Sequence, residues 1–172
     1  MVSEGFFLRT MMPEDADAVA RIGYESWVED RFHPEWFGPA VERRVHDAFR
    51  KFADDPQADV VVCQVADEIA GWGARDSRDH PGDRSQPWNY ISDLWTAPLW
   101  QGKGIGTAII DELLSRMRAE AIETATIEVV EANHKAHRLY LKRGFAEMWR
   151  GDTFSETLGL PIRRILLERQ FG

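Results

Sequence analysis

Three glycines alternate with other residues directly before an apolar helix pattern. Gly102, Gly104 and Gly106 lie in the stretch QGKGIGTAII, and residues 105–121 then carry an apolar side chain at every fourth position. The first N–H groups of a helix have no partner within the helix and together carry about half a positive charge. Glycines let a phosphate approach those groups closely because they have no side chain. The spacing therefore indicates a phosphate-binding turn at the start of a helix.

The nucleotide-binding motifs with a glycine-rich turn fit this stretch poorly. A P-loop ends in Gly-Lys-Ser or Gly-Lys-Thr, which the sequence lacks. The dinucleotide fingerprint has its third glycine where this chain has Thr107. The glycine spacing alone leaves the phosphate ligand undecided.

The residues around the glycines favour one ligand. The stretch DLWTAPLWQGKGIGTAII resembles the acetyl-CoA-binding motif of the GCN5-related N-acetyltransferases (GNAT), which reads Gln or Arg, two residues, Gly, one residue, and Gly or Ala. Gln101, Gly104 and Gly106 match this pattern in full. The resemblance implies the GNAT fold and acetyl-CoA as the acetyl donor.

A second motif of the same family follows downstream. The stretch TIEVVEANHKAHRLYLKRGFAE is similar to the family's strand, Asn133, and a helix that carries Tyr140 and ends at Gly144. The two motifs together cover residues 91–145. The flanking segments agree with the family in the order of their elements only.

The resemblance implies how the cosubstrate is held. The amides of the glycine turn would bind the pyrophosphate, and Lys103 would add a cation. The strand before the turn would run beside the pantetheine arm, while the strand at 124–131 diverges to make room. Thr96 stands where the family usually has Val, which leaves a backbone contribution intact. The cofactor-binding residues that we expect are Leu94, Trp95, Thr96, Gln101, Gly102, Lys103, Gly104, Ile105, Gly106, Thr107 and Asn133.

Catalysis needs an acid for the departing thiolate and a base for the attacking ammonium. Tyr140 is the expected acid, because a phenol within hydrogen-bond reach of the sulfur can protonate it; the alternative is an aromatic residue of the core. Asp93 and Glu128 are candidate bases, directly or through water, although neither is singled out by the sequence. Asn133 also fits a plain helix N-cap.

Aromatic residues crowd the end of the first helix and the loop after it. In this family that region forms the acceptor side of the cleft, so Trp27, Phe32 and Trp36 are expected to bind the acceptor, with core packing as the alternative. The polar loop at 78–90 is expected to form a further wall, which favours a small-molecule acceptor.

The elements that must position these residues follow from the apolar periodicity. Strands are predicted at 5–12, around a hairpin at Asp67-Glu68, and at 90–98, 124–131, 145–152 and 161–171. Helices are predicted at 13–30, 40–53, 105–121 and 132–144. We expect a single GNAT domain over residues 1–172, of the α/β class, with a mixed and mostly antiparallel sheet of about seven strands flanked by about four helices.

Composition excludes several other classes. The 21 Lys and Arg against 29 Asp and Glu give a net charge of −8, which disfavours nucleic acid. No stretch has the apolar pattern of a signal peptide or a membrane span, so a cytoplasmic protein without a membrane partner is expected. The single cysteine, Cys63, is predicted to be buried, and the five histidines lack metal-ligand spacing, so no metal and no covalent intermediate are expected.

The function expected from these features is transfer of an acetyl group from acetyl-CoA to a primary amine of a small molecule, by direct attack in a ternary complex. Two alternatives stay open: an acetyltransferase acting on the N-terminus or a lysine of a protein or peptide, and a module that binds CoA without turnover. A homodimer is compatible with the sequence.

Overall fold

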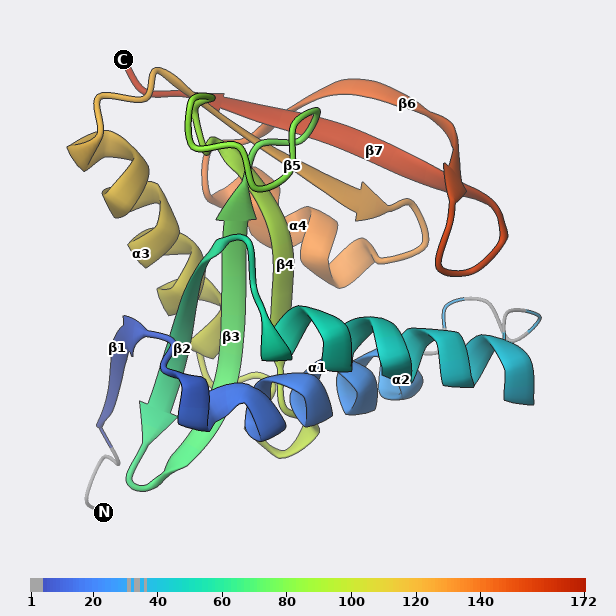
Figure 1. Ribbon diagram of the computed structural model, residues 1–172. Helices are drawn as coiled ribbons and strands as arrows, with labels where there is room; N and C mark the ends of the chain where they lie inside the picture. Colours follow the sequence, from blue (N-terminus) through green and yellow to red (C-terminus); the bar gives the residue numbers. More distant parts are fainter. Residues whose placement is uncertain (1–4, 31, 33–34, 36) are drawn as a thin grey trace.

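The computed structural model describes residues 5–30, 32, 35 and 37–172 and has the order of elements expected from the sequence (Figure 1). The strands are β1 (Phe6–Thr10), β2 (Asp59–Val65), β3 (Glu68–Asp76), β4 (Tyr90–Thr96), β5 (Thr124–Val130), β6 (Ala146–Ser155) and β7 (Leu160–Gln170). The helices are α1 (Ala16–Asp30), α2 (Pro39–Asp54), α3 (Ile105–Ala119) and α4 (His134–Lys142). The predicted helix at 13–30 begins with a separate 3-10 turn at Pro13–Asp15.

The strands form one seven-stranded sheet in the order β1-β2-β3-β4-β5-β7-β6, so the expected mixed sheet of about seven strands is confirmed. Among the described strands, β4 and β5 are the one parallel pair, and they pair only at Tyr90–Thr126 and Ile91–Ile127. Beyond these rungs β4 stays paired with β3, and β5 stays paired with β7. The two central strands therefore diverge, as expected, and leave a gap in the middle of the sheet.

Helix α3 packs closely on one face of the sheet because β3 is glycine-rich there. A Cβ on Gly71 would lie 3.0 Å from the Ile105 side chain of α3, and one on Gly73 would lie 2.6 Å from the Ile109 side chain. The predicted stripe of α3 is fully buried on this face. This packing fixes the start of α3 beside the end of β4, where the glycine turn lies.

Helices α1 and α2 cover the opposite face, in front of β2, β3 and β4 in Figure 1. Their contact is tight, since a Cβ on Gly23 would lie 2.5 Å from the Phe49 ring. Phe52 stacks on Trp72 of β3 at 5.3 Å between ring centroids. Cys63 is buried in β2, as predicted, and burial raises the pKa of its thiol to about 11. Among the described residues, no helix is both long and apolar enough to cross a membrane.

Candidate active site

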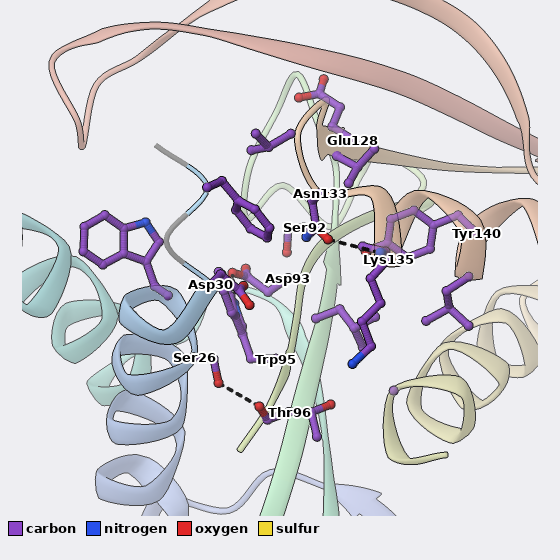
Figure 2. A pocket seen from close by; sticks show the side chains of 18 of the residues that line it. Ser26, Asp30, Ser92, Asp93, Trp95, Thr96, Glu128, Asn133, Lys135 and Tyr140 are labelled. Carbon is purple, nitrogen blue, oxygen red and sulfur yellow. Dashed lines mark hydrogen bonds between the residues drawn. The ribbon is translucent and has the colours of Figure 1, made fainter. Parts of the chain in front are cut away.

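A cavity of about 670 Å³ opens where β4 and β5 diverge. One part is lined by β4, the glycine turn and α4, and the other by α1, α2 and the turn between β6 and β7. Figure 2 shows the side chains around it, with Asp30 and Asp93 on one side and Tyr140 of α4 on the other. The gap in the sheet thus joins a phosphate-binding turn to a second compartment.

The glycine turn leaves its amides exposed for a ligand. Gly102 and Gly104 have φ values of +74° and +83°, which other residues rarely adopt, and a Cβ built on either would meet no heavy atom within 4 Å. Helix α3 begins its backbone ladder with the bond from Ala108 N–H to the Gly104 carbonyl, 3.0 Å long. The amides from Ile105 to Thr107 therefore lie ahead of the ladder, as phosphate binding requires.

Gly106 faces a narrow slot between three elements. A Cβ there would lie 3.6 to 3.9 Å from Thr96 Oγ1, Leu139 Cδ2 and Leu94 Cδ2, which are ordinary contact distances. The turn and its surroundings thus fit an extended ligand that runs from the α3 amides into the gap between β4 and β5. These observations fit coenzyme A, whose pyrophosphate is continuous with a thin pantetheine arm.

The carbonyl of Thr96 holds the site together. It accepts a hydrogen bond of 2.8 Å from the Ser26 hydroxyl (Figure 2) and one of 3.4 Å from the Gln101 side-chain amide. Ser26 therefore fastens α1 to β4, and Gln101 fastens the glycine turn to β4. The Gln101 side chain thus helps to hold the glycine turn in place beside β4. Lys103, in contrast, places its ammonium 4.7 Å from the centre of the Trp100 ring.

The backbone groups along β4 alternate in direction. Ala97 N–H bonds to the Ala70 carbonyl of β3, so by alternation the groups of Trp95 also face β3, and those of Leu94 and Thr96 face the gap. With the Thr96 carbonyl taken, Leu94 offers the free edge of this strand. The indole of Trp95 instead lines the cavity and meets Phe49 edge-on at 5.3 Å.

Helix α4 and its N-cap line the cavity, with Asn133 from the cap and Lys135, Ala136, Leu139 and Tyr140 from the helix. The Asn133 side chain accepts a hydrogen bond of 3.1 Å from Ala136 N–H, so it is the N-cap, and it also lines the cavity. Tyr140 is 5% exposed and packs in the core cluster, yet no described residue forms a hydrogen bond with its hydroxyl. Burial raises the pKa of this phenol, with smaller contributions from Tyr90, Asp30 and Asp93. Tyr140 therefore keeps its proton at neutral pH and can donate it.

The two carboxylates named from the sequence have different surroundings. Burial raises the pKa of Asp93 to about 6, although hydrogen bonds from Trp95 and Ser92 lower it in part. Glu128 lies 2.6 Å from an Arg78 nitrogen and 4.0 Å from one of Arg164. Asp93 can therefore lose and regain a proton near neutral pH, as a general base must, whereas Glu128 forms ion pairs with Arg78 and Arg164.

Irregular pairing aims Asp93 into the cavity. In the β3–β4 register, Arg75 opposes Ile91 and Ala74 opposes Asp93, so Ser92 is an extra residue on β4. Such a bulge bends a strand and redirects the side chains beside it. The sequence contains no local signal for it.

A third carboxylate, Asp30, was not predicted from the sequence. It is the last residue of α1 and lines the cavity, and burial raises its pKa to about 6. A signal does exist, because α1 buries Val19, Ile22 and Ser26, and Asp30 lies one turn after Ser26 on the same stripe.

The acceptor side is only partly as expected. Trp27 and Phe32 line the cavity, and Trp27 stacks on Phe37 at 4.7 Å, whereas Trp36 lies outside the described residues. Of the loop at 78–90, only Tyr90 lines the cavity, so the wall predicted there is wrong. The β6–β7 hairpin takes that place, with Ser155, Thr157, Leu158 and Ile162, because it folds back towards α1 and α2 (Figure 1). In the described part of the chain, no group of three His, Cys, Asp or Glu is arranged to hold a metal.

Comparisons with known proteins agree with this geometry. The chain is 26% identical over 146 residues to the mycothiol acetyltransferase of Propionibacterium freudenreichii subsp. shermanii, a match that covers 83% of this chain and 44% of that protein. It is 25% identical over 144 residues to the aminoglycoside N(6′)-acetyltransferase type 1 of Stenotrophomonas maltophilia, covering 80% of this chain and 86% of that protein. The chain thus spans less than half the length of the first of these relatives.

A solved structure has the same fold. The PaiA N-acetyltransferase of Thermoplasma acidophilum, determined in complex with coenzyme A, aligns with a TM-score of 0.72 at 14% identity, over 97% of this chain and 99% of that chain. The model of the acetyltransferase (GNAT) family matches residues 24–145. The chain therefore belongs to the GNAT family, and the expected GNAT fold is confirmed.

Proposed function

We propose that the protein transfers an acetyl group from acetyl-CoA to a primary amine of a small molecule. One observation carries this function: a single cavity joins free helix amides to a half-buried carboxylate on one wall and a buried phenol on the other. Membership in the GNAT family and the names of the relatives support the same reaction.

The α3 turn and β4 would hold the acetyl donor. The amides of residues 102–107 would bind the pyrophosphate, with Lys103 close by. Leu94 and the Thr96 N–H would pair with the pantetheine amides along the edge that β5 has left. Bound acetyl-CoA supplies an acetyl group activated as a thioester. Asn133 would contact the cosubstrate at the start of α4 in addition to capping that helix.

Asp93 and Tyr140 would move the protons. An amine arrives as ammonium, and Asp93 would take its proton, directly or through a water molecule. Tyr140 would donate the phenol proton to the sulfur of coenzyme A as the thiolate leaves. The two groups extend from different walls of the cavity, so each can act at its own end of the reaction (Figure 2). Glu128 would orient Arg78 and Arg164 and take no proton itself.

The shape of the acceptor compartment supports a small acceptor. Its walls come from α1, α2 and the β6–β7 turn, and the whole cavity of about 670 Å³ falls in the range of small-molecule sites. Trp27 and Phe32 would contact the acceptor as predicted. The two relatives are named for mycothiol and aminoglycosides, which are small molecules.

Turnover tests this function directly. The protein is mixed with acetyl-CoA and a panel of primary amines, and the release of free thiol is followed by its reaction with a disulfide reagent. The acetylated amine is identified by mass spectrometry. We expect thiol release that depends on the amine. Tight CoA binding without thiol release for any amine, including amino-terminal peptides, would instead support a binding module.

A further inference from the structure

Asp30 occupies an electrostatically unfavourable place. It ends α1, where the helix dipole is negative, and the last turn of α1 carries no basic residue. Among the described residues, none donates a hydrogen bond to Asp30 or forms an ion pair with it. Burial raises its pKa, and the charge of Glu29 acts in the same direction, while Lys135 of α4 acts against both. Such a carboxylate destabilises the protein until a cation binds to it.

Lys135 lines the same cavity and its charge lowers the pKa of Asp30, but the two form no ion pair, and the other charged side chains of the cavity have partners elsewhere or are acidic themselves. Arg164 donates a hydrogen bond of 2.9 Å to the Thr153 hydroxyl and lies beside Glu128. Glu128 in turn is paired with Arg78. Asp93 accepts a hydrogen bond of 3.0 Å from the Trp95 indole but has no ion pair among the described residues. Two carboxylates, Asp30 and Asp93, therefore line the same cavity, and neither forms an ion pair with a cation in the part of the chain that the structure describes.

A second observation indicates that a ligand completes this part of the molecule. The Tyr140 hydroxyl belongs to a residue that is 5% exposed, faces the cavity, and has no hydrogen-bond partner among the described residues. Trp27 lies one turn before Asp30 on α1 and lines the same compartment. A carboxylate beside an aromatic ring is a common arrangement for binding an ammonium group.

We propose that Asp30 binds a second ammonium group of the acceptor, so that the preferred substrates are diamines or polyamines. This inference rests on the proposed acetyl transfer. The amine that reacts lies at Asp93, and the distal ammonium lies at Asp30, with its alkyl chain against Trp27. Asp30 would thus determine which amines are acetylated and would take no part in the proton transfers.

Matched amines test the proposal. Linear diamines with two to six methylenes are each compared with the monoamine of equal length, because the series varies the distance between the two ammonium groups. Calorimetry measures amine binding to the protein saturated with CoA, and thiol release measures kcat/KM. We expect the best diamine to bind at least about tenfold more tightly than its monoamine, the range of one charge-assisted hydrogen bond.

Two variants separate Asp30 from general charge effects. Asp30→Asn keeps the size of the side chain and should reduce the diamine-to-monoamine ratio to about one to two. Glu29→Gln removes the same charge from the neighbouring exposed residue, which does not line the cavity, and should keep most of the preference. Circular dichroism melts establish that both variants are folded.

The inference and the proposed function fail in different ways. A ratio near one for every diamine with the wild-type protein, or a preference that survives in Asp30→Asn, overturns the role of Asp30. Turnover of monoamines would persist in that case, and the acetyltransferase function would stand. Conversely, preferential binding of diamines without any thiol release would support the Asp30 site and contradict the acetyl transfer.

Discussion

Replacement of Tyr140 by Phe separates a catalytic phenol from a core residue. The ring is 5% exposed and packs near Phe145, with ring centroids 6.2 Å apart, and Phe keeps that packing. The hydroxyl has no partner among the described residues, so its removal breaks no hydrogen bond of the folded protein. We therefore expect the free energy of unfolding to change by less than about 0.5 kcal/mol, since only a satisfied hydroxyl contributes about 1 kcal/mol.

The rate should change far more than the stability. Loss of a general acid typically reduces kcat by about 100- to 10,000-fold, which equals about 2.7 to 5.5 kcal/mol of barrier. The affinity for acetyl-CoA should stay within about threefold, because the proton is donated only as the thiolate leaves.

The assay measures kcat with a saturating amine, the Kd for CoA, and urea unfolding of the same preparations. Tyr24→Phe is the matched control, since Tyr24 belongs to α1 and does not line the cavity. A Tyr140→Phe protein that turns over at the wild-type rate would refute the role of Tyr140 as the acid. A stability loss above about 1 kcal/mol would show that the hydroxyl has a structural partner.

Three further outcomes follow from the site. Gln101→Ala should weaken CoA binding by about two- to tenfold, because one side-chain bond to the Thr96 carbonyl is lost while the amides remain; a loss above 100-fold would mean that this side chain contacts the ligand. The rate should rise with pH through about 6 as Asp93 loses its proton, and Asp93→Asn should lower kcat by about 100-fold or more and remove that limb; an unchanged profile would assign the base elsewhere. The pKa of Asp30 is raised to about 6, so the folded state loses stability as pH rises from about 4 to 6. Asp30→Asn should therefore gain about 1 kcal/mol in urea unfolding at pH 7.5, after allowance for solvent screening, and less at pH 5; a less stable variant at pH 7.5 would contradict the unpaired carboxylate.

Local patterns were sufficient to predict the parts of the site that are continuous in sequence. The turn that ends in Gly106 and the buried stripe of α3 depend on spacing within about 15 residues, which periodicity reports directly. The divergence of β5 from β4 came from the family resemblance. The order of helices and strands along the chain also followed from short-range hydrophobic patterns.

The acceptor compartment depends on contacts between distant segments, and there the predictions were incomplete. Ser26 bonds to Thr96 across 70 positions, and the β6–β7 turn approaches α1 and α2 from the other end of the chain. The bulge at Ser92 shows only in the pairing register. Asp30 was not named from the sequence, although its place on the stripe of Ser26 could have revealed it.

The most direct test of the central claim is CoA binding to Gly106→Val, measured by calorimetry beside the wild-type protein. The Cβ of the added side chain would meet Thr96, Leu139 and Leu94 at ordinary contact distances, and Gly106 has no positive φ, so we expect the protein to stay folded, which a circular dichroism melt checks. Pantetheine and pyrophosphate need that same space, and we predict a Kd increased by at least about 100-fold, equal to about 2.7 kcal/mol. Wild-type affinity for CoA in a folded Gly106→Val protein would contradict the assignment of this turn as the acetyl-CoA site.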